Sequence, residues 1–230
     1  MPVLVARGAG VRQRRRWLFR DLDVSVEPGE VVAVVGPPGS GRTTLLLALA
    51  GRFRLSAGKL SAGKLSAGKL SAGKLSAGKL SAGKLSAGKP SAGKRSAGKI
   101  DGGAALGHVP GVTDPEPVFT VAEHLQERRA LLGRRNHAVP EDLLGLDPGT
   151  KARDLTPYEK QLLGLILANM AKPAVIALDG LDDGLDADEQ AWLLKVLHEI
   201  AAAGTAVVFT ARDIDPDNVT TVIRLGEETK

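Results

Sequence analysis

Hydrophobic residues along the chain fall into two kinds of pattern. Short, almost continuously apolar runs are typical of strands buried on both faces of a parallel sheet. Three such runs occur, at Glu30–Val35, Ala174–Leu178 and Thr205–Thr210. Other apolar or amphipathic segments predict helices, at Leu45–Ala50, Val121–Leu132, Tyr158–Met170 and Ala187–Ala203. Strands and helices in alternation predict an α/β fold.

A five-residue repeat interrupts this pattern from Leu55 to Lys99, with LSAGK seven times and then PSAGK and RSAGK. On a helix its leucines would spiral, and on a strand successive leucines would point to opposite faces. We therefore expect 55–99 to be a flexible tether inserted into one domain made of 1–54 and 100–230. A coil that turns every five residues is the alternative. The flanks, Arg54–Leu60 and Lys99–Gly103, predict a β-hairpin region around the insertion.

Charge and composition exclude some function classes. The net charge is +5, but nine lysines and Arg95 lie in the repeat, so the other residues carry −5. With aromatic residues at only 3%, this balance disfavours nucleic-acid binding. A lysine tether that binds anionic lipid remains a third possibility. There is no cysteine, no apolar run near the length of a membrane span, no signal peptide pattern and no zinc-ligand spacing, which fits a cytoplasmic protein.

A glycine-rich loop follows the first apolar run and precedes the first helix. Its backbone N–H groups can face phosphate at the positive end of that helix, and Thr43 can place a hydroxyl on Mg²⁺. Arg42 stands where such loops usually have lysine. The predicted nucleotide-binding residues are Gly36, Pro37, Pro38, Gly39, Ser40, Gly41, Arg42, Thr43 and Thr44. A second match, GKLSAGK at 58–64, lacks a following hydroxyl residue and a preceding strand, so we discard it.

With this loop in place, the chain resembles the ATP-binding cassette family, the nucleotide-binding subunits of ABC transporters. The second apolar run ends in Asp179, the family's Mg²⁺-binding aspartate, and Gly184–Leu185–Asp186 matches its dimer-interface loop. The resemblance implies a P-loop NTPase core with a small antiparallel sheet and a helical subdomain. It also implies ATP and Mg²⁺ as cofactors, a separately encoded membrane permease as partner, homo- or heterodimers, and a location at the cytoplasmic membrane.

Four positions depart from the family pattern. Gly180 replaces the glutamate that polarises water, Ala211 the switch histidine and Gly111 the γ-phosphate-sensing glutamine. The signature loop reads Leu155–Thr156–Pro157–Tyr158–Glu159, in which Pro157 has no N–H to donate. Thr156 and Glu159 also form a capping-box pattern for the helix that follows.

Three further residues are weaker candidates. Trp17 is at a plausible distance for stacking on the nucleotide base, although it can equally be a surface or core residue. Asp182 and Asp183 could substitute for the missing glutamate, although such clusters are commonly solvated loop. We expect an ATP-binding transporter subunit with impaired hydrolysis; the alternative is a non-hydrolysing nucleotide sensor or scaffold.

Overall fold

A parallel sheet forms the centre of the protein. The computed structural model describes residues 1–61, 103–133 and 139–226. Within them, five strands pair in the order β5-β6-β7-β3-β8, and every pairing in this sheet is parallel. The strands are β3 (Val31–Val35), β5 (Ala104–Leu106), β6 (Val175–Leu178), β7 (Ala206–Ala211) and β8 (Thr221–Arg224). The three predicted buried strands are confirmed, each with its ends shifted by one residue or less.

A second, antiparallel sheet packs beside the first. Strands β1 (Leu4–Gln13) and β2 (Arg16–Val26) form a hairpin, and β4 (Ala57–Ser61) pairs with the other edge of β1. Strand β4 is made of repeat residues, three from the first unit and two from the second, so the start of the repeat belongs to this sheet. Gly58 makes this possible: a side chain there would begin 2.2 Å from the Gly8 carbonyl oxygen. The rest of the repeat lies outside the described residues.

The hairpin expected around the repeat is not formed by its described flanks. Strand β4 pairs with β1, whereas Gly103 leads into β5, which pairs with β6 in the parallel sheet. Residues 99–102 of the second flank lie outside the described residues. The chain on either side of the repeat therefore belongs to two different sheets, and local strand patterns could not reveal this.

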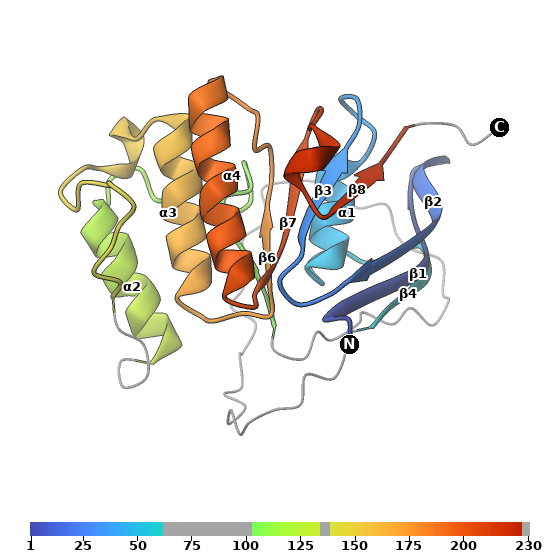
Figure 1. The fold of residues 1–230 in the computed structure, drawn as a ribbon, viewed down its shortest axis with the longest axis horizontal. Coiled ribbons are helices and arrows are strands. Elements are labelled where there is room, and N and C mark those ends of the chain that lie inside the picture. Colours follow the sequence, from blue (N-terminus) through green and yellow to red (C-terminus); the bar gives the residue numbers. More distant parts are fainter. Residues whose placement is uncertain (62–102, 134–138, 227–230) are drawn as a thin grey trace.

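Helices cover both faces of the parallel sheet. They are α1 (Arg42–Leu49), α2 (Val121–Leu132), α3 (Pro157–Asn169) and α4 (Ala187–Ala202). Figure 1 shows α2, α3 and α4 on one side of the sheet, with α1 and the antiparallel sheet on the other. Side chains along β3 point alternately to the two faces of the sheet. Val31, Ala33 and Val35 pack in the core under α3 and α4. Val32 and Val34 pack in the core under α1.

The strands also decide where a site can lie. Because β3, β6 and β7 are parallel neighbours, their carboxyl ends meet at one edge of the sheet. Ligands of open α/β sheets bind beyond these ends. The glycine loop, Asp179 and Ala211 each lie at such an end, although they are far apart in the sequence.

Candidate functional site

The loop between β3 and α1 has a backbone that only glycine adopts easily. Gly36, Gly39 and Gly41 have φ of +155°, +80° and +97°, in the region that favours glycine. A side chain at Gly36 would begin 2.5 Å from the Leu225 carbonyl oxygen, whereas Gly39 has nothing within 4 Å of that position. The loop therefore packs on β8 at one side and is open at the other.

The start of α1 has room for an anion. Gly41 caps this helix without a side-chain hydrogen bond, and the first turn has no acidic residue, so its N–H groups retain their attraction for negative charge. The hydroxyl of Ser40 is buried without a hydrogen-bond partner. Arg42 has no acidic residue within 4.0 Å among the described residues. The phosphates of a nucleotide could therefore accept hydrogen bonds from the backbone N–H groups and the Ser40 hydroxyl, and could pair with the Arg42 guanidinium.

Asp179 joins this loop to the end of β6. Thr43 Oγ1 in α1 donates to Asp179 Oδ2 at 2.8 Å, and Thr210 Oγ1 in β7 donates to Asp179 Oδ1. The Asp179 side chain is nearly buried. Hydroxyl and carboxylate oxygens are ligands that Mg²⁺ accepts, so the predicted metal residues Thr43 and Asp179 lie together, and their chemistry fits that ion.

Gly180, next to Asp179, is held in a conformation that disfavours any side chain. Its φ is +66°, and its N–H donates to Thr210 Oγ1 at 2.8 Å. A side chain at this position would begin 2.6 Å from Asp183 Oδ2. The carboxylate of Asp183 thus lies over the place from which a glutamate at position 180 would start.

The two weaker catalytic candidates are already paired. The Arg212 guanidinium lies 3.3 Å from Asp182 Oδ2 and 2.8 Å from Asp183 Oδ1. The Arg212 N–H also donates to Asp182 Oδ2 at 3.0 Å, and both carboxylates raise the pKa of Arg212, with the Asp183 hydrogen bond as the largest cause. We call Asp182, Asp183 and Arg212 the arginine clamp. It ties the loop after β6 to the loop after β7.

The other replaced positions have structural roles. Ala211 is the fully buried last residue of β7. Gly111 lies in a turn with φ of +75° and donates its N–H to Asp114 Oδ2 at 2.8 Å. Pro157 is the first residue of α3, and the predicted capping box is confirmed by reciprocal hydrogen bonds between Thr156 and Glu159.

Trp17 lies in β2, and the two residues that follow it, Leu18 and Phe19, contact the glycine loop. A side chain at Gly41 would begin 3.1 Å from Leu18 Cβ and 3.4 Å from Phe19 Cδ1. The Trp17 ring itself contacts Arg12, whose guanidinium carbon is 6.0 Å from the ring centroid. A base-stacking role for Trp17 stays a prediction.

Two residues near the site were missed by the sequence analysis. Gln161 of α3 is buried and donates to the Asp179 carbonyl oxygen at 2.9 Å. His108 accepts the Asp179 N–H on its own carbonyl oxygen at 3.0 Å, and burial lowers the pKa of its side chain. A polar residue within the apolar stripe of a predicted helix was the available signal for Gln161; nothing in the sequence marked His108.

The family model described as "ABC transporter" matches residues 19–181 of this chain. Among curated relatives, a Streptomyces avermitilis protein named as an ABC transporter ATP-binding protein is 27% identical over 94% of this chain. The hemin import ATP-binding protein of Gloeobacter violaceus is 50% identical over 24% of it. The matched part is 34% of the first relative's length and 20% of the second's, so this chain spans about a third of the longer match.

Solved structures agree on the fold. An ABC transporter ATP-binding protein of Pyrococcus furiosus superposes with a TM-score of 0.69, covering 96% of each chain at 17% identity. At this identity the likeness concerns the fold alone. No helix in the described residues is both long enough and apolar enough to cross a membrane.

Proposed function

Because this chain belongs to the ABC transporter family, we propose that it is the ATP-binding part of a membrane transporter and that it binds Mg·ATP with weak or absent hydrolysis. The observation that carries the proposal is the 2.8 Å hydrogen bond from Thr43 to Asp179. It places hydroxyl and carboxylate oxygens side by side, next to an open loop with free N–H donors.

Different residues of the site would bind the phosphates and the Mg²⁺ ion. The backbone from Gly36 to Thr44 and the Arg42 guanidinium would hold the phosphates, and Thr43 and Asp179 would hold Mg²⁺, which offsets the phosphate charge when bound. Arginine keeps the charge of the usual lysine but offers a planar fork instead of a compact ammonium. The backbone donors do not depend on this difference, which is why we expect binding to survive it.

Titration with a fluorescent ATP analogue, with and without Mg²⁺, tests this part of the proposal. We expect saturable binding that Mg²⁺ strengthens, and Thr43→Ala should remove most of the Mg²⁺ effect. Ser25→Ala, which removes an exposed hydroxyl from β2, is the matched control. Absence of saturable binding up to millimolar nucleotide would refute the proposal.

Weak hydrolysis follows from the side chains around the second half of the site. Gly180 has no carboxylate to orient water, Ala211 no imidazole, and Pro157 no N–H to offer to a partner's nucleotide. Each such loss typically lowers a rate by about 10²–10³-fold, although groups that act as a unit do not multiply. The arginine clamp also pairs Asp182 Oδ2 and Asp183 Oδ1 with Arg212, which supports the expectation that neither aspartate takes the role of the missing glutamate.

A permease, and a second nucleotide-binding subunit, are the partners that this function needs. The proposed location is the cytoplasmic face of the membrane, through that permease. The relatives' names support a transporter context: one is a hemin import ATP-binding protein. A second nucleotide-binding subunit with intact catalytic residues would allow transport to proceed even if this site is inactive.

A non-hydrolysing nucleotide sensor or scaffold is the second candidate, and the arginine clamp favours it. Measuring phosphate release by the purified protein, alone and reconstituted with the permease, separates the two. Turnover that appears only with the permease supports the transporter subunit. Because a transporter subunit without hydrolysis would also show no turnover, the sensor is supported only when the protein binds nucleotide, releases no phosphate in either condition and does not bind the permease.

A further inference from the structure

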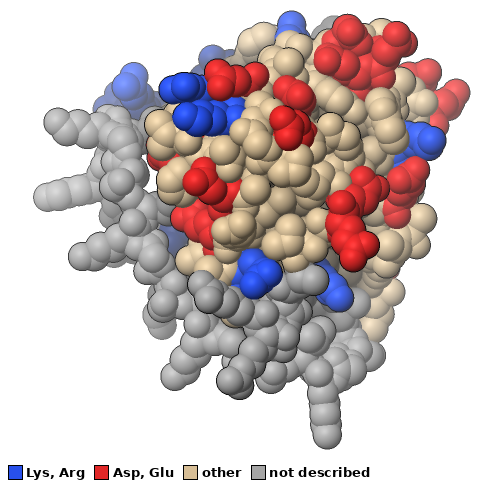
Figure 2. Space-filling view, turned by 90° about the vertical axis from the view of Figure 1, so that its left-hand side faces the viewer, with Lys and Arg blue, Asp and Glu red and all other residues tan. Residues whose placement is uncertain are grey.

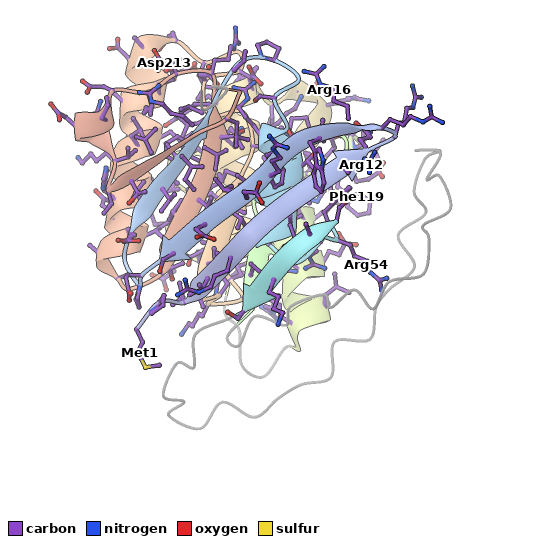
Figure 3. The ribbon with its side chains drawn as sticks, turned by 90° about the vertical axis from the view of Figure 1, so that its right-hand side faces the viewer. Met1, Arg12, Arg16, Arg54, Phe119 and Asp213 are labelled. Carbon is purple, nitrogen blue, oxygen red and sulfur yellow. The ribbon has the colours of Figure 1, made fainter. Side chains whose placement is uncertain are left out.

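Basic side chains gather at one end of the antiparallel sheet. Five arginines lie there: Arg12 near the end of β1, Arg14 and Arg15 in the hairpin turn, Arg16 at the start of β2, and Arg54 shortly before β4. All five are exposed, and we call them the arginine row. Figure 3 shows Arg16, Arg12 and Arg54 at the same end of the three strands.

Hydrogen bonds between neighbouring segments hold this row together. The Ser56 N–H donates to the Gly10 carbonyl oxygen at 2.7 Å, and the Arg12 N–H donates to Ser56 Oγ at 3.0 Å. Arg12 faces Trp17 across the hairpin. Arg54, two residues before Ser56, is thereby brought to the same end of the sheet as Arg12, although 42 positions separate them in the sequence, and the row is a property of the fold.

The charge of the row is not neutralised by nearby residues. Within 1–61, 103–133 and 139–226, no acidic side chain lies within 4.0 Å of any of its five guanidinium groups. Residues 1–61 hold ten basic and four acidic residues, whereas the described residues from 103 onwards hold nine basic and nineteen acidic ones. Acidic groups accordingly dominate the opposite side, over the helices (Figure 2). The protein thus has a basic end and an acidic body.

Aromatic side chains lie within the row. Trp17 is 37% exposed and stacks under Arg12, and Phe53, beside Arg54 in the sequence, is 45% exposed. Arginine next to exposed aromatic rings suits the headgroup level of an anionic bilayer, where the guanidinium meets phosphate and the ring meets the acyl boundary.

We propose that the arginine row is a contact surface for the anionic phospholipids of a bilayer. A membrane plane touches only one end of the molecule, so the acidic body stays away from it. An extended nucleic acid would pass from the basic end along that acidic body, where like charges repel. This proposal assigns Trp17 to the membrane in place of base stacking, and nothing in its test requires ATP.

Sedimentation of the full chain with phosphatidylcholine vesicles, with and without phosphatidylglycerol, tests the proposal. We expect binding only to the anionic vesicles, weakened by added salt. Replacing Arg12, Arg15, Arg16 and Arg54 together with Gln should weaken it by about tenfold or more, because each basic residue near an anionic surface adds to the affinity. Unchanged binding by this variant overturns the proposal.

The repeat offers a control with the same change of charge. Replacing Lys69, Lys74, Lys79 and Lys84 with Gln should reduce vesicle binding much less than the arginine variant does. An equal or larger loss would assign the binding to the lysine-rich repeat and overturn the proposal. Thermal unfolding of both variants must match the wild type, as expected for exposed positions.

Two further readouts locate the contact and its ligand. In a Trp192→Phe background, Trp17 is the single tryptophan, and its emission should shift to the blue when anionic vesicles are added. No shift on binding would place the contact elsewhere and contradict the proposal. A duplex DNA oligomer should compete poorly for the protein; displacement from vesicles at lower phosphate concentration would favour a nucleic-acid partner instead.

Discussion

The two halves of the candidate site differ in which groups are still free. In the glycine loop, Gly39 is open, Ser40 has an unpaired hydroxyl and Arg42 has no acidic partner in the described residues. In the loops after β6 and β7, Asp182 and Asp183 each have one carboxylate oxygen paired with Arg212, and Asp182 Oδ1 is buried without a hydrogen-bond partner.

The comparison shows why a protein of this fold can bind a nucleotide without hydrolysing it. Phosphate binding rests largely on backbone N–H groups, which most substitutions leave in place. Hydrolysis rests on particular side chains, and each replacement removes one. In this structure the space beside Gly180 is taken by Asp183, which pairs with Arg212 in the arginine clamp. Substitutions at four residues test the site, and they follow from the largest expected effect to the smallest.

Asp179→Ala should have the largest effect, because Asp179 joins the two halves. Affinity for Mg·ATP should fall roughly 10–100-fold, as for the loss of a metal-site partner. The free energy of unfolding should fall by about 1–3 kcal/mol, since Thr43 and Thr210 lose their acceptor. Nucleotide titration and urea unfolding measure the two effects. Asp217→Ala, at an exposed position, is the control; an unchanged affinity for Mg·ATP would show that the halves work independently.

Gly180→Glu should fail to restore hydrolysis. The left-handed backbone and the carboxylate of Asp183 oppose a side chain there, so Gly180→Ala should already cost about 1–3 kcal/mol of unfolding free energy. Gly149→Ala is the matched control, because its new methyl group would meet only an ordinary contact, 3.5 Å from Asp147. Phosphate release and urea unfolding are the measurements. Robust ATP turnover by Gly180→Glu would mean that Asp183 moves aside at little cost in free energy.

His108 predicts a pH effect on stability beside the site. Burial lowers its pKa below the ordinary 6.5, although the hydrogen bond and charge of Asp114 oppose this; Lys160 lowers the pKa and Asp179 raises it. The unfolded chain therefore binds a proton at higher pH than the folded protein. The free energy of unfolding should fall as the pH drops from about 7 toward about 5.

The variant His108→Gln should lose this part of the pH dependence, as followed by urea unfolding at several pH values. His198→Gln, at an exposed position of α4, is the control and should keep the wild-type profile. A profile for His108→Gln that matches the wild type would show that His108 does not couple stability to pH.

Arg212→Gln should have the smallest effect on stability, because the Arg212 and Asp183 side chains are exposed and screened by solvent, and the mostly buried Asp182 keeps its hydrogen bond from the backbone N–H of residue 212. We expect a slight fall in the melting temperature that vanishes at high salt, with nucleotide affinity unchanged. Lys195→Gln changes the charge equally on α4 and is the control. A gain in phosphate release would show that freeing Asp182 and Asp183 restores a water-orienting carboxylate.

Much of the fold could be predicted from local patterns. The predicted helix Val121–Leu132 has those same bounds in the structure, and the strands differ by a residue or less. The capping box at Thr156 was predictable because a cap depends on residues three positions apart. Local physics also identified the glycine loop, since strand, glycines and helix are contiguous there.

Long-range contacts were beyond such patterns. Arg212 meets Asp183 across 29 positions, and Thr43 meets Asp179 across 136. Strand β5, which begins directly after the second predicted flank of the repeat, pairs with β6 in the parallel sheet and not with β4. Sequence patterns give the period of an element, but they do not specify which element lies beside it.

The sequence by itself determined the α/β character and the phosphate loop, and it predicted where residues depart from the family's pattern, because each depends on residue types at short spacing. Only the tertiary structure decided that Gly180 is covered by Asp183, that Arg212 holds the two aspartates, and that five arginines form one row. These arrangements arise where strand ends and sheet edges bring distant segments together, and that placement is set by the packing of the whole domain.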